Sequence, residues 1–412
     1  MATYYIDHIG GNDTLDGLSP DNARKNYIDI DLSAGDTVLF KRGSFYRDKL
    51  YAQGYVTYGA YGEGAKPTFC ASVDVSDPSD WIATDKENVW KCAKPILGDV
   101  GNIAFNDGEC NATFRWNLED LSAQGDFYDG QCVTGDRIEE KTFNTDFYLY
   151  SVGNPANVYS HIEAISYNKR HLVSATDGMT FESLRFINSG VHGIQGVGDN
   201  ITVRDCDFEN IGGCAWSRHL EIRFGNGFEI WDHGDNILIE NCTFKNVYDS
   251  CVTHQGPGEN TKTAKNFICR GCTFDTFGMA AFEYRDKLPI DSSFTDNVCL
   301  NAGCGFAMLG EALPRKSEIW PQPMGHHIFM WRIPEASEGG NLVIKNNYFG
   351  PAPVGAAIYS IISPEAEAQV TVDCNKYTRN DILLNRWGGK DYNDLEEYKK
   401  ESGNDESSVY AV

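Results

Sequence analysis

The sequence has few basic residues for its length. It carries 35 Lys and Arg against 59 Asp and Glu, which gives a net charge of −24 at pH 7. Nucleic acid and anionic membrane surfaces bind proteins through clustered Lys and Arg, so this balance argues against both partners. It also disfavours a polyanionic ligand unless a cation intervenes.

Long apolar runs and a leader sequence are missing as well. No stretch of eighteen apolar residues is present, so no membrane-spanning segment is expected. The N-terminus, MATYYIDHIGG, lacks the basic and apolar regions of a signal peptide. The sequence therefore predicts a cytoplasmic protein, although a secreted protein trimmed of its leader would look the same.

The cysteines do not form the usual spacing patterns. There are 13, an odd number spread along the chain, without the two Cys-x-x-Cys motifs of a structural zinc site. This argues against a disulfide framework and predicts buried free thiols in a reducing compartment. No metal and no cofactor are expected, and the oligomeric state is left open.

What the sequence does contain is a repeated unit of strand-like residues. The copies are MTFESLRF from Met179, ITVRDCDF from Ile201, ILIENCTF from Ile237, FICRGCTF from Phe267, LVIKNNYF from Leu342 and VTVDCNKY from Val370, with FTDNVCLN from Phe294 as a weaker copy. The first two copies start 22 residues apart, which sets the minimal coil. Six or seven stacked copies with variable spacing indicate a solenoid with loops inserted at a corner.

Columns within the repeat indicate which solenoid it is. Asn200, Asn236, Asn266 and Asn341 precede four of the units, and Asn tolerates the left-handed conformation of a tight corner. The sequence predicts an all-β fold, a right-handed parallel β-helix, and the alternative is a β-sandwich with chance similarity. The β-helix should place five rings in one internal stack: Phe186, Phe208, Phe244, Phe274 and Phe349.

The remaining segments are expected to cap or decorate this solenoid. Residues 1–79 read as an N-terminal cap, with a strand and a short helix, followed by the first coils. Residues 80–165 break the period and show the alternation and turns of an inserted antiparallel β region. The coils with the functional face span 166–380. Residues 381–412 read as a short capping helix, with Leu395 and Tyr398 at helical spacing, and a loose tail.

Aligning the sequences of the second strand of each coil predicts a polar face on the solenoid. The aligned segments are HGIQG from His192, NGFEIW from Asn226, SCVTHQ from Ser250, AAFEYR from Ala280, CGFAML from Cys304 and GAAIYS from Gly355. Strand side chains alternate, so an outward column follows the apolar one. Its members are Gln195, Glu229, Thr253, Glu283 and Ala307, and the same face carries Trp231, Gln255 and Arg285 two residues later. Asp249 stands before its strand, aligned with Gly190, Gly278 and Gly303.

Two carboxylates flanking a sugar-sized gap are what hydrolysis of a glycosidic bond requires, since one donates a proton and the other activates water or attacks. Glu229 and Glu283 are two strands apart, about 10 Å at the backbone, and Asp249 is the third candidate. Trp231 offers a stacking platform for a sugar ring. Arg285 is expected to hold Glu283 ionised. The alternative is a solvated face with incidental charges.

Further side chains are candidates for binding the substrate. Asp232 precedes a turn, and Gln195 and Gln255 share the predicted face. His254 aligns with inward residues, which favours a core or corner position, and it is kept as a binding candidate. A long loop from Gly310 to Gly340 should fold over the cleft and bring Trp320, His326, His327 and Trp331 to it.

The phrases GNGFEIW, VYDSCVTHQG and AAFEYR resemble those of β-helix glycoside hydrolases, including β-xylosidase-like and fucosidase- or xylanase-like families. The resemblance covers most of the chain and implies cleavage of a glycosidic bond by carboxylates on the coil face. The matching positions here are Glu229, Asp249 and Glu283, without an assignment of acid and base.

Three functions compete on these observations. The leading one is a glycoside hydrolase acting on a neutral oligo- or polysaccharide, with a carbohydrate as its only predicted partner. The second is a polysaccharide lyase or uronate epimerase, which needs a basic proton abstractor and usually Ca²⁺. Arg285 is the one obvious cation of the face. The third is a glycan-binding or adhesion solenoid without turnover.

Overall fold

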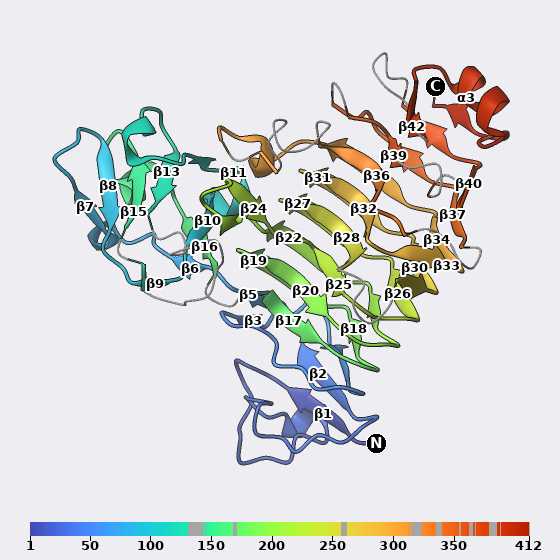
Figure 1. The fold of residues 1–412 in the computed structure, drawn as a ribbon. Helices are drawn as coiled ribbons and strands as arrows, with labels where there is room; N and C mark the ends of the chain where they lie inside the picture. Colours follow the sequence, from blue (N-terminus) through green and yellow to red (C-terminus); the bar gives the residue numbers. More distant parts are fainter. Residues whose placement is uncertain are drawn as a thin grey trace.

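The computed structural model describes residues 1–130, 143–144, 146–167, 171–256, 262–311, 313–314, 324–334, 340–353, 356–361, 366, 368–378, 385–387 and 389–411. Within these ranges, the repeat units stack as the coils of a parallel β-helix (Figure 1). Each full coil contributes one strand to each of three sheets, which we name A, B and C. Trp320 lies outside the described residues.

The three sheets have the following strands. Sheet A contains β1 (Thr3–Ile6), β2 (Thr37–Lys41), β4 (Thr57–Tyr61), β18 (Thr180–Glu182), β21 (Thr202–Arg204), β26 (Ile237–Glu240), β30 (Phe267–Arg270), β34 (Ser292–Thr295), β37 (Leu342–Lys345) and β40 (Val370–Asp373). Sheet B contains β3 (Phe45–Tyr46), β5 (Thr68–Cys70), β19 (Arg185–Ser189), β22 (Asp207–Ile211), β27 (Thr243–Val247), β31 (Thr273–Phe277), β35 (Val298–Ala302), β38 (Tyr348–Phe349), β41 (Lys376–Tyr377) and β44 (Val409–Tyr410). Sheet C contains β17 (His171–Ala175), β20 (His192–Gly196), β25 (Phe228–Trp231), β28 (Ser250–Gln255), β32 (Ala280–Arg285), β36 (His326–Trp331), β39 (Tyr359–Ile361), β42 (Asn385–Trp387) and β43 (Lys390–Tyr392).

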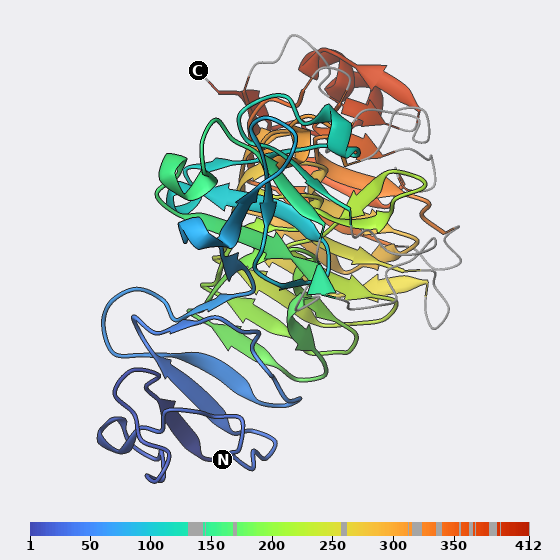
Figure 2. The ribbon, with the colours of Figure 1, turned by 90° about the vertical axis from the view of Figure 1, so that its left-hand side faces the viewer.

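An antiparallel region is inserted between the first coils and the rest; it lies to one side of the β-helix in Figure 1 and in front of the coils in Figure 2. Its strands are β6 (Val73–Asp74), β7 (Trp81–Ala83), β8 (Val89–Cys92), β9 (Ile96–Leu97), β10 (Val100–Phe105), β11 (Cys110–Asn111), β12 (Thr113–Phe114), β13 (Asp126–Asp129), β14 (Phe143–Asn144), β15 (Phe147–Tyr150) and β16 (Ile162–Ser166). Its apolar core includes Tyr248 and Phe306 of the coils, so the two parts pack as one body.

The other elements are short. Two small ladders project from the coils, β23 (Cys214–Ser217) with β24 (Ile222–Phe224) and β29 (Thr263–Lys265) with β33 (Leu288–Ile290). The helices are α1 (Pro155–Val158), α3 (Leu395–Ser402), and the 3₁₀ turns Pro20–Asn22, Pro78–Asp80, Asn106–Gly108, Leu118–Asp120 and Phe306–Met308. No helix in the described ranges is long and apolar enough to cross a membrane. The predicted all-β solenoid with an N-terminal cap, an antiparallel insertion and a C-terminal helix is confirmed.

The predicted phenylalanine stack runs through the core. The centroids of the Phe208 and Phe244 rings are 4.6 Å apart, and those of Phe244 and Phe274 are 5.2 Å apart. Phe186 extends the stack at one end. Between Phe274 and Phe349 the column holds Cys299, and the ring of Phe294 fills the space instead.

The asparagine corner is confirmed at three of its four positions. Asn200, Asn236 and Asn266 have φ of 60°, 58° and 53°, the left-handed region. Each amide donates to the previous Asn oxygen, at 3.1 Å from Asn236 to Asn200 and 3.0 Å from Asn266 to Asn236. The side-chain ladder adds a bond between coils at a place where the backbone turns.

The weak repeat copy from Phe294 was aligned two residues out of register. Phe294 pairs with Cys269 and Ile344, the third position of its neighbours, so the unit begins at Ser292. The sixth position is then Asn297, whose Oδ1 accepts the backbone N–H of Cys272 at 2.9 Å. Cys242 Sγ makes the equivalent bond in an earlier coil, accepting the backbone N–H of Cys206 at 3.4 Å. Cys and Asn can therefore replace each other at the sixth position, because both accept this hydrogen bond.

Two further expectations about chain segments are wrong. The segment from Cys304 does not continue sheet C, because Ala280 pairs with His326 and Phe282 with Ile328. The predicted loop from Gly310 to Gly340 therefore contains a coil strand, β36. The last residues are also not loose, since β44 pairs with β41 in sheet B.

The twelve described cysteines are free. One Cys-x-x-Cys spacing exists, between Cys269 and Cys272, and both side chains lie in the core. Burial raises the pKa of Cys206, Cys242 and Cys272, which keeps these thiols protonated and slow to oxidise.

Thiol titration of denatured, unreduced protein is expected to find all 13 groups of the chain. The native protein should react quickly only at exposed thiols such as Cys110, Cys304 and Cys374. A total well below 13 in the denatured protein would show that disulfides form.

Candidate active site

The predicted polar column on sheet C is present in the predicted register. Gln195 pairs with Glu229, Glu229 with Thr253, and Thr253 with Glu283. The next member is Phe329 rather than Ala307, because β36 supplies the following strand. Glu229 and Glu283 thus lie on one face with a single strand, β28, between them.

This face is covered, not exposed as the alternation alone implied. Glu229 is 2% exposed, Thr253 0% and Glu283 1%, whereas Trp231 at 37% marks the solvent edge. On the adjacent strand β36, the Phe329 and Trp331 side chains lie on this same face, beside Glu283 and Arg285, and both rings are buried in a small apolar cluster. Buried carboxylates need partners, and the neighbouring side chains supply them.

Glu229 accepts hydrogen bonds at both carboxylate oxygens. The amide of Gln195 donates to Oε1 at 3.1 Å, and the amides of Asn226 and Gln255 both donate to Oε2 at 2.5 Å. His192 Nδ1 lies 3.6 Å from Oε2. That nitrogen already accepts the backbone N–H of Asn226 at 3.0 Å, so we interpret His192 as a spacer rather than a cationic partner.

Glu283 is held from the other side of the same face. Ser250 Oγ donates to Oε2 at 2.7 Å, and Trp331 Nε1 donates to Oε1 at 2.8 Å. Asn226 connects the two carboxylates, because its Oδ1 accepts the backbone N–H of Ser250 at 2.9 Å. One hydrogen-bonded chain therefore runs from Gln195 to Trp331 across five strands.

Thr253 stands between the carboxylates with its hydroxyl unused. Its Oγ1 is buried and has no hydrogen-bond partner within the described part of the protein. A buried hydroxyl without a partner is costly, so its position between two acids suits a polar ligand group.

Arg285 does not form the ion pair with Glu283 that the sequence suggested. Its guanidinium carbon lies 5.4 Å from the Trp231 ring centroid and 5.6 Å from that of Trp331. The carboxylate near its Nε is that of Asp286, at 3.7 Å. Arg285 thus packs between two tryptophans at the rim, where cation–π contact replaces the expected ion pair.

His192, Asn226 and Ser250 were not predicted as site residues, and for Ser250 the reason is local. Cys251 and Val252 are consecutive, yet both belong to the main core, so alternation breaks at the start of β28. As a result, Ser250 contacts the outer face, although counting back by two from the inward Val252 would place it in the core. Nothing in the sequence alone signals such a break.

His254 faces the interior, as its alignment favoured, and His327 does so against expectation. His254 is fully buried, bonds the carbonyl of Gly234 at 2.9 Å and contacts the Phe267 ring. His327 is fully buried against Phe277 and Phe349. Neither imidazole reaches the outer face of sheet C, so neither can contact a ligand bound there.

Both buried histidines should make the fold sensitive to acid. Burial lowers the pKa of His327 to about 4, from an ordinary value of 6.5. Between about pH 4 and 6.5 this histidine binds a proton in the unfolded chain but not in the folded protein. The free energy of unfolding therefore falls as the pH falls from about 6.5 toward 4. We expect the wild type to lose about 2 kcal/mol more than His327→Gln between about pH 7 and 4.5, as measured by urea unfolding. An equal loss in both proteins would refute this role.

Asp232 lies at the turn after β25, as expected, whereas Asp249 is not in the expected column. Asp232 lies 3.6 Å from the Nζ of Lys287, a fully buried cation that the sequence did not single out. Burial lowers the pKa of Lys287. Asp249 is buried at the corner before Ser250 and its backbone pairs with Gly225 and Met279, one residue away from the predicted glycine column.

Within the described ranges, no three His, Cys, Asp or Glu side chains are grouped to hold a metal ion.

Residues 154–313 match a family model described as "Right handed beta helix region". A parallel strand that returns to its own sheet makes a right-handed crossover in nearly all proteins, which agrees with this match. The fold is a right-handed parallel β-helix.

Three solved structures are similar to the chain at low sequence identity. The structure of XylC with xylose has 12% identity and a TM-score of 0.45, over 99% of this chain and 82% of that one. The GH136 lacto-N-biosidase from Eubacterium ramulus has 15% identity and a TM-score of 0.38, over 93% and 57%. Pectate lyase Pel9A has 13% identity and a TM-score of 0.41, over 93% and 70%.

No curated protein matches the sequence. A fold does not by itself determine a reaction, because one scaffold can carry many kinds of site.

Proposed function

We propose that this β-helix is a glycoside hydrolase that cleaves a neutral oligo- or polysaccharide. The observation that supports it most is the pair Glu229 and Glu283 on one face, joined by hydrogen bonds through Asn226 and Ser250. Two carboxylates that flank a bound sugar can serve as the acid and the base of glycosidic bond hydrolysis.

The separation of the pair favours inversion of the anomeric centre. Strands in a sheet are about 4.8 Å apart, so residues two strands apart are roughly 10 Å apart at the backbone. An inverting pair needs about 6.5–9.5 Å between its carboxyl groups to hold a water against the sugar. In this proposal one glutamate protonates the leaving oxygen, the other activates water, and Thr253 Oγ1 binds that water or a sugar hydroxyl.

The rim suits a neutral sugar. Trp231 is exposed at the edge, and Arg285 lies between Trp231 and Trp331, so a ring entering here meets flat surfaces before it meets the acids. The net charge of −24 and the two buried glutamates would repel a uronate chain. A carbohydrate substrate is thus the proposed partner, and a cytoplasmic location stays part of the proposal.

A panel of plant and bacterial glycans tests the function directly. We expect release of reducing sugar from a neutral glycan, with no new ultraviolet absorbance in the products. Unsaturated products that absorb in the ultraviolet would favour a lyase instead, and binding without any release would favour a glycan-binding solenoid.

A further inference from the structure

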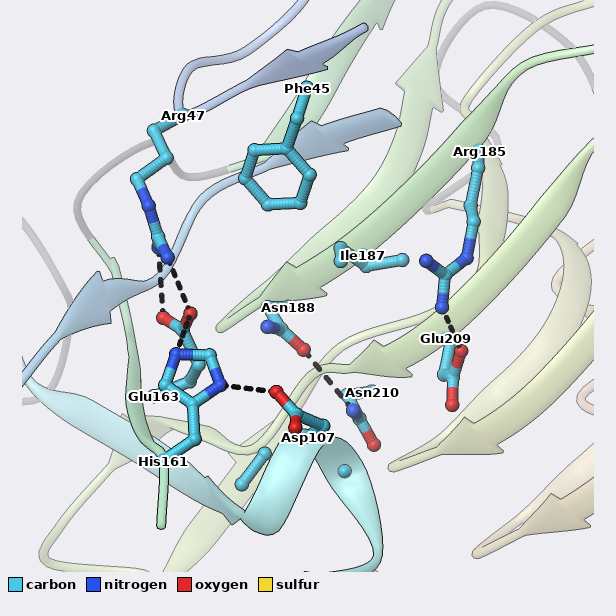
Figure 3. Close-up of a pocket in the computed structure, with 12 residues that line it drawn as sticks. Phe45, Arg47, Asp107, His161, Glu163, Arg185, Ile187, Asn188, Glu209 and Asn210 are labelled. Atoms are coloured by element: carbon cyan, nitrogen blue, oxygen red, sulfur yellow. Dashed lines mark hydrogen bonds and ion pairs between the residues drawn. The ribbon is translucent and has the colours of Figure 1, made fainter. Parts of the chain in front are cut away.

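A second polar cavity lies on another side of the β-helix, between sheet B and the antiparallel insertion. It has a volume of about 430 Å³ and is lined by residues of β3, β19 and β22 on the coils and of β10, β16 and the turn Asn106–Gly108 on the insertion (Figure 3). This volume falls in the range of small-molecule sites, roughly 300–1,000 Å³. The carboxylate pair belongs to sheet C, so this is a different site.

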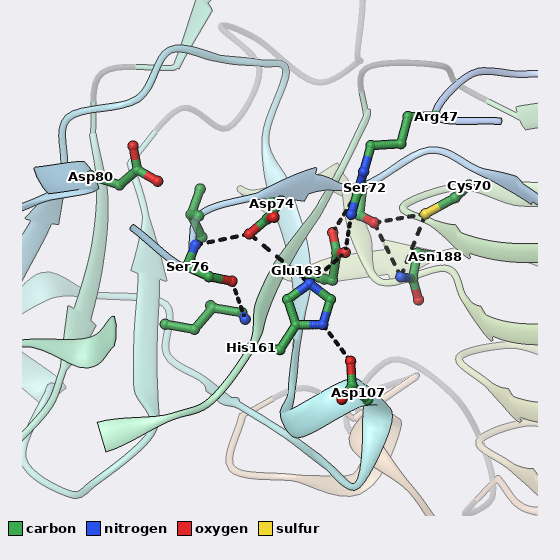
Figure 4. A network of polar contacts seen from close by, with 12 residues as sticks. Arg47, Cys70, Ser72, Asp74, Ser76, Asp80, Asp107, His161, Glu163 and Asn188 are labelled. Atoms are coloured by element: carbon green, nitrogen blue, oxygen red, sulfur yellow. Dashed lines mark hydrogen bonds and ion pairs between the residues drawn. The ribbon is translucent and has the colours of Figure 1, made fainter. Parts of the chain in front are cut away.

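One wall is a fixed network of charged side chains. Arg47 donates to both oxygens of Glu163, at 2.9 and 2.7 Å. His161 lies 3.1 Å from Glu163 through Nε2 and 2.6 Å from Asp107 through Nδ1 (Figure 4). A bidentate Arg–carboxylate pair combined with a bridging imidazole holds all four groups in one geometry.

The other wall repeats this pairing on the coils. Arg185 donates to Glu209 at 2.6 Å, and Asn210 donates to Asn188 Oδ1 at 3.1 Å. Between the two ion pairs, Figure 3 shows the ring of Phe45, which is 41% exposed and 5.4 Å from the guanidinium carbon of Arg47. An exposed ring flanked by ion pairs gives the cavity one flat apolar surface among hydrogen-bonding groups.

The chemistry of this lining selects a class of ligand. Each guanidinium is already paired with a carboxylate, so a phosphate or a carboxylate ligand would meet Glu163, Glu209 and Asp107 as well as the cations. Hydroxyl groups both donate and accept, and therefore match alternating Arg, carboxylate and amide groups. A sugar ring combines such hydroxyls with an apolar C–H face that stacks on an aromatic ring.

We propose that this cavity is a binding site for a neutral saccharide unit, stacked on Phe45 and bonded by the Arg47–Glu163 and Arg185–Glu209 pairs. The site holds a glycan against the junction of the insertion and the coils and carries out no reaction itself. The proposal does not rest on hydrolysis at sheet C, because it concerns binding alone.

Calorimetric titration of the full chain with xylobiose, cellobiose and lactose tests the proposal, with digalacturonate as the anionic comparison. At least one neutral disaccharide should bind, and Phe45→Ala should weaken that binding about tenfold, the equivalent of about 1.4 kcal/mol for a lost stacking surface. Because Phe45 is exposed, the variant should melt as the wild type does. Arg185→Ala, at the opposite wall, should weaken binding as well.

Tyr51→Ala is the matched control, since Tyr51 is 43% exposed and does not line the cavity. Its affinity should equal that of the wild type. Equal affinity in the wild type, Phe45→Ala and Arg185→Ala would place all binding elsewhere and overturn the proposal. No binding of the three neutral sugars, or binding of digalacturonate alone, would overturn it too. Loss of turnover in the sheet C variants would leave this result unchanged.

Discussion

Glu229→Gln and Glu283→Gln are each expected to fold as the wild type does and to lower turnover by about 10²–10⁴-fold. The amide keeps the size of the side chain and can still accept from Ser250, Trp331 or the neighbouring amides. It can neither donate a proton as an acid nor remove one from water, so the chemical step should suffer while substrate binding changes little. Initial rates of reducing-sugar release measure the effect.

Glu240→Gln is the matched control for these variants. Glu240 is also an outward strand glutamate with partners on both neighbouring strands, Arg204 and Arg270, but it belongs to sheet A. Its substitution should leave turnover unchanged. Near-normal rates in both Glu229→Gln and Glu283→Gln would remove the assignment and direct attention to Asp232 and Asp249.

The largest stability effect is expected from Phe244→Ala. Phe244 is fully buried and lies between the rings of Phe208 and Phe274, at 4.6 and 5.2 Å. Its truncation should lower the free energy of unfolding by about 3–5 kcal/mol, because neighbouring coils are fixed by their ladders and cannot close the cavity. Urea unfolding monitored by circular dichroism gives the value.

Phe45→Ala is the control for Phe244→Ala, because it removes the same side chain from an exposed position. Phe45→Ala should change the free energy of unfolding by no more than about 0.5 kcal/mol. A similarly small loss in Phe244→Ala would mean that the stack contributes little and that the ladders alone hold the coils together.

Repetition explains why so much of the fold was accessible from sequence. Phe208, Phe244 and Phe274 occupy the same position in their repeat units, so aligning the units also aligned the three rings. The Asn corner followed from a backbone requirement, the left-handed conformation, that few residues meet. Prediction failed where the repeat was degenerate, as at Phe294, where chance similarity shifted the unit by two residues.

The site was predicted less completely because its contacts are tertiary. The Glu229–Thr253–Glu283 column follows from alternation, but Trp331 reaches Glu283 from a strand 48 residues away along the chain. Arg47 and Glu163 of the second cavity are 116 residues apart. The first contact depends on which segment supplies the strand next to β32, and the second depends on how the antiparallel insertion packs on the coils, so no local pattern encodes either of them.

The stereochemistry of the product tests the central claim most directly. On the glycan identified by the reducing-sugar panel, ¹H NMR of the anomeric proton during the first turnovers shows which anomer forms first. Carboxylates two strands apart, with a water between them, predict the inverted anomer. A retained anomer would require the acids to be about 5–5.5 Å apart and would contradict the assignment of Glu229 and Glu283 as the pair, and an unsaturated product would contradict hydrolysis itself.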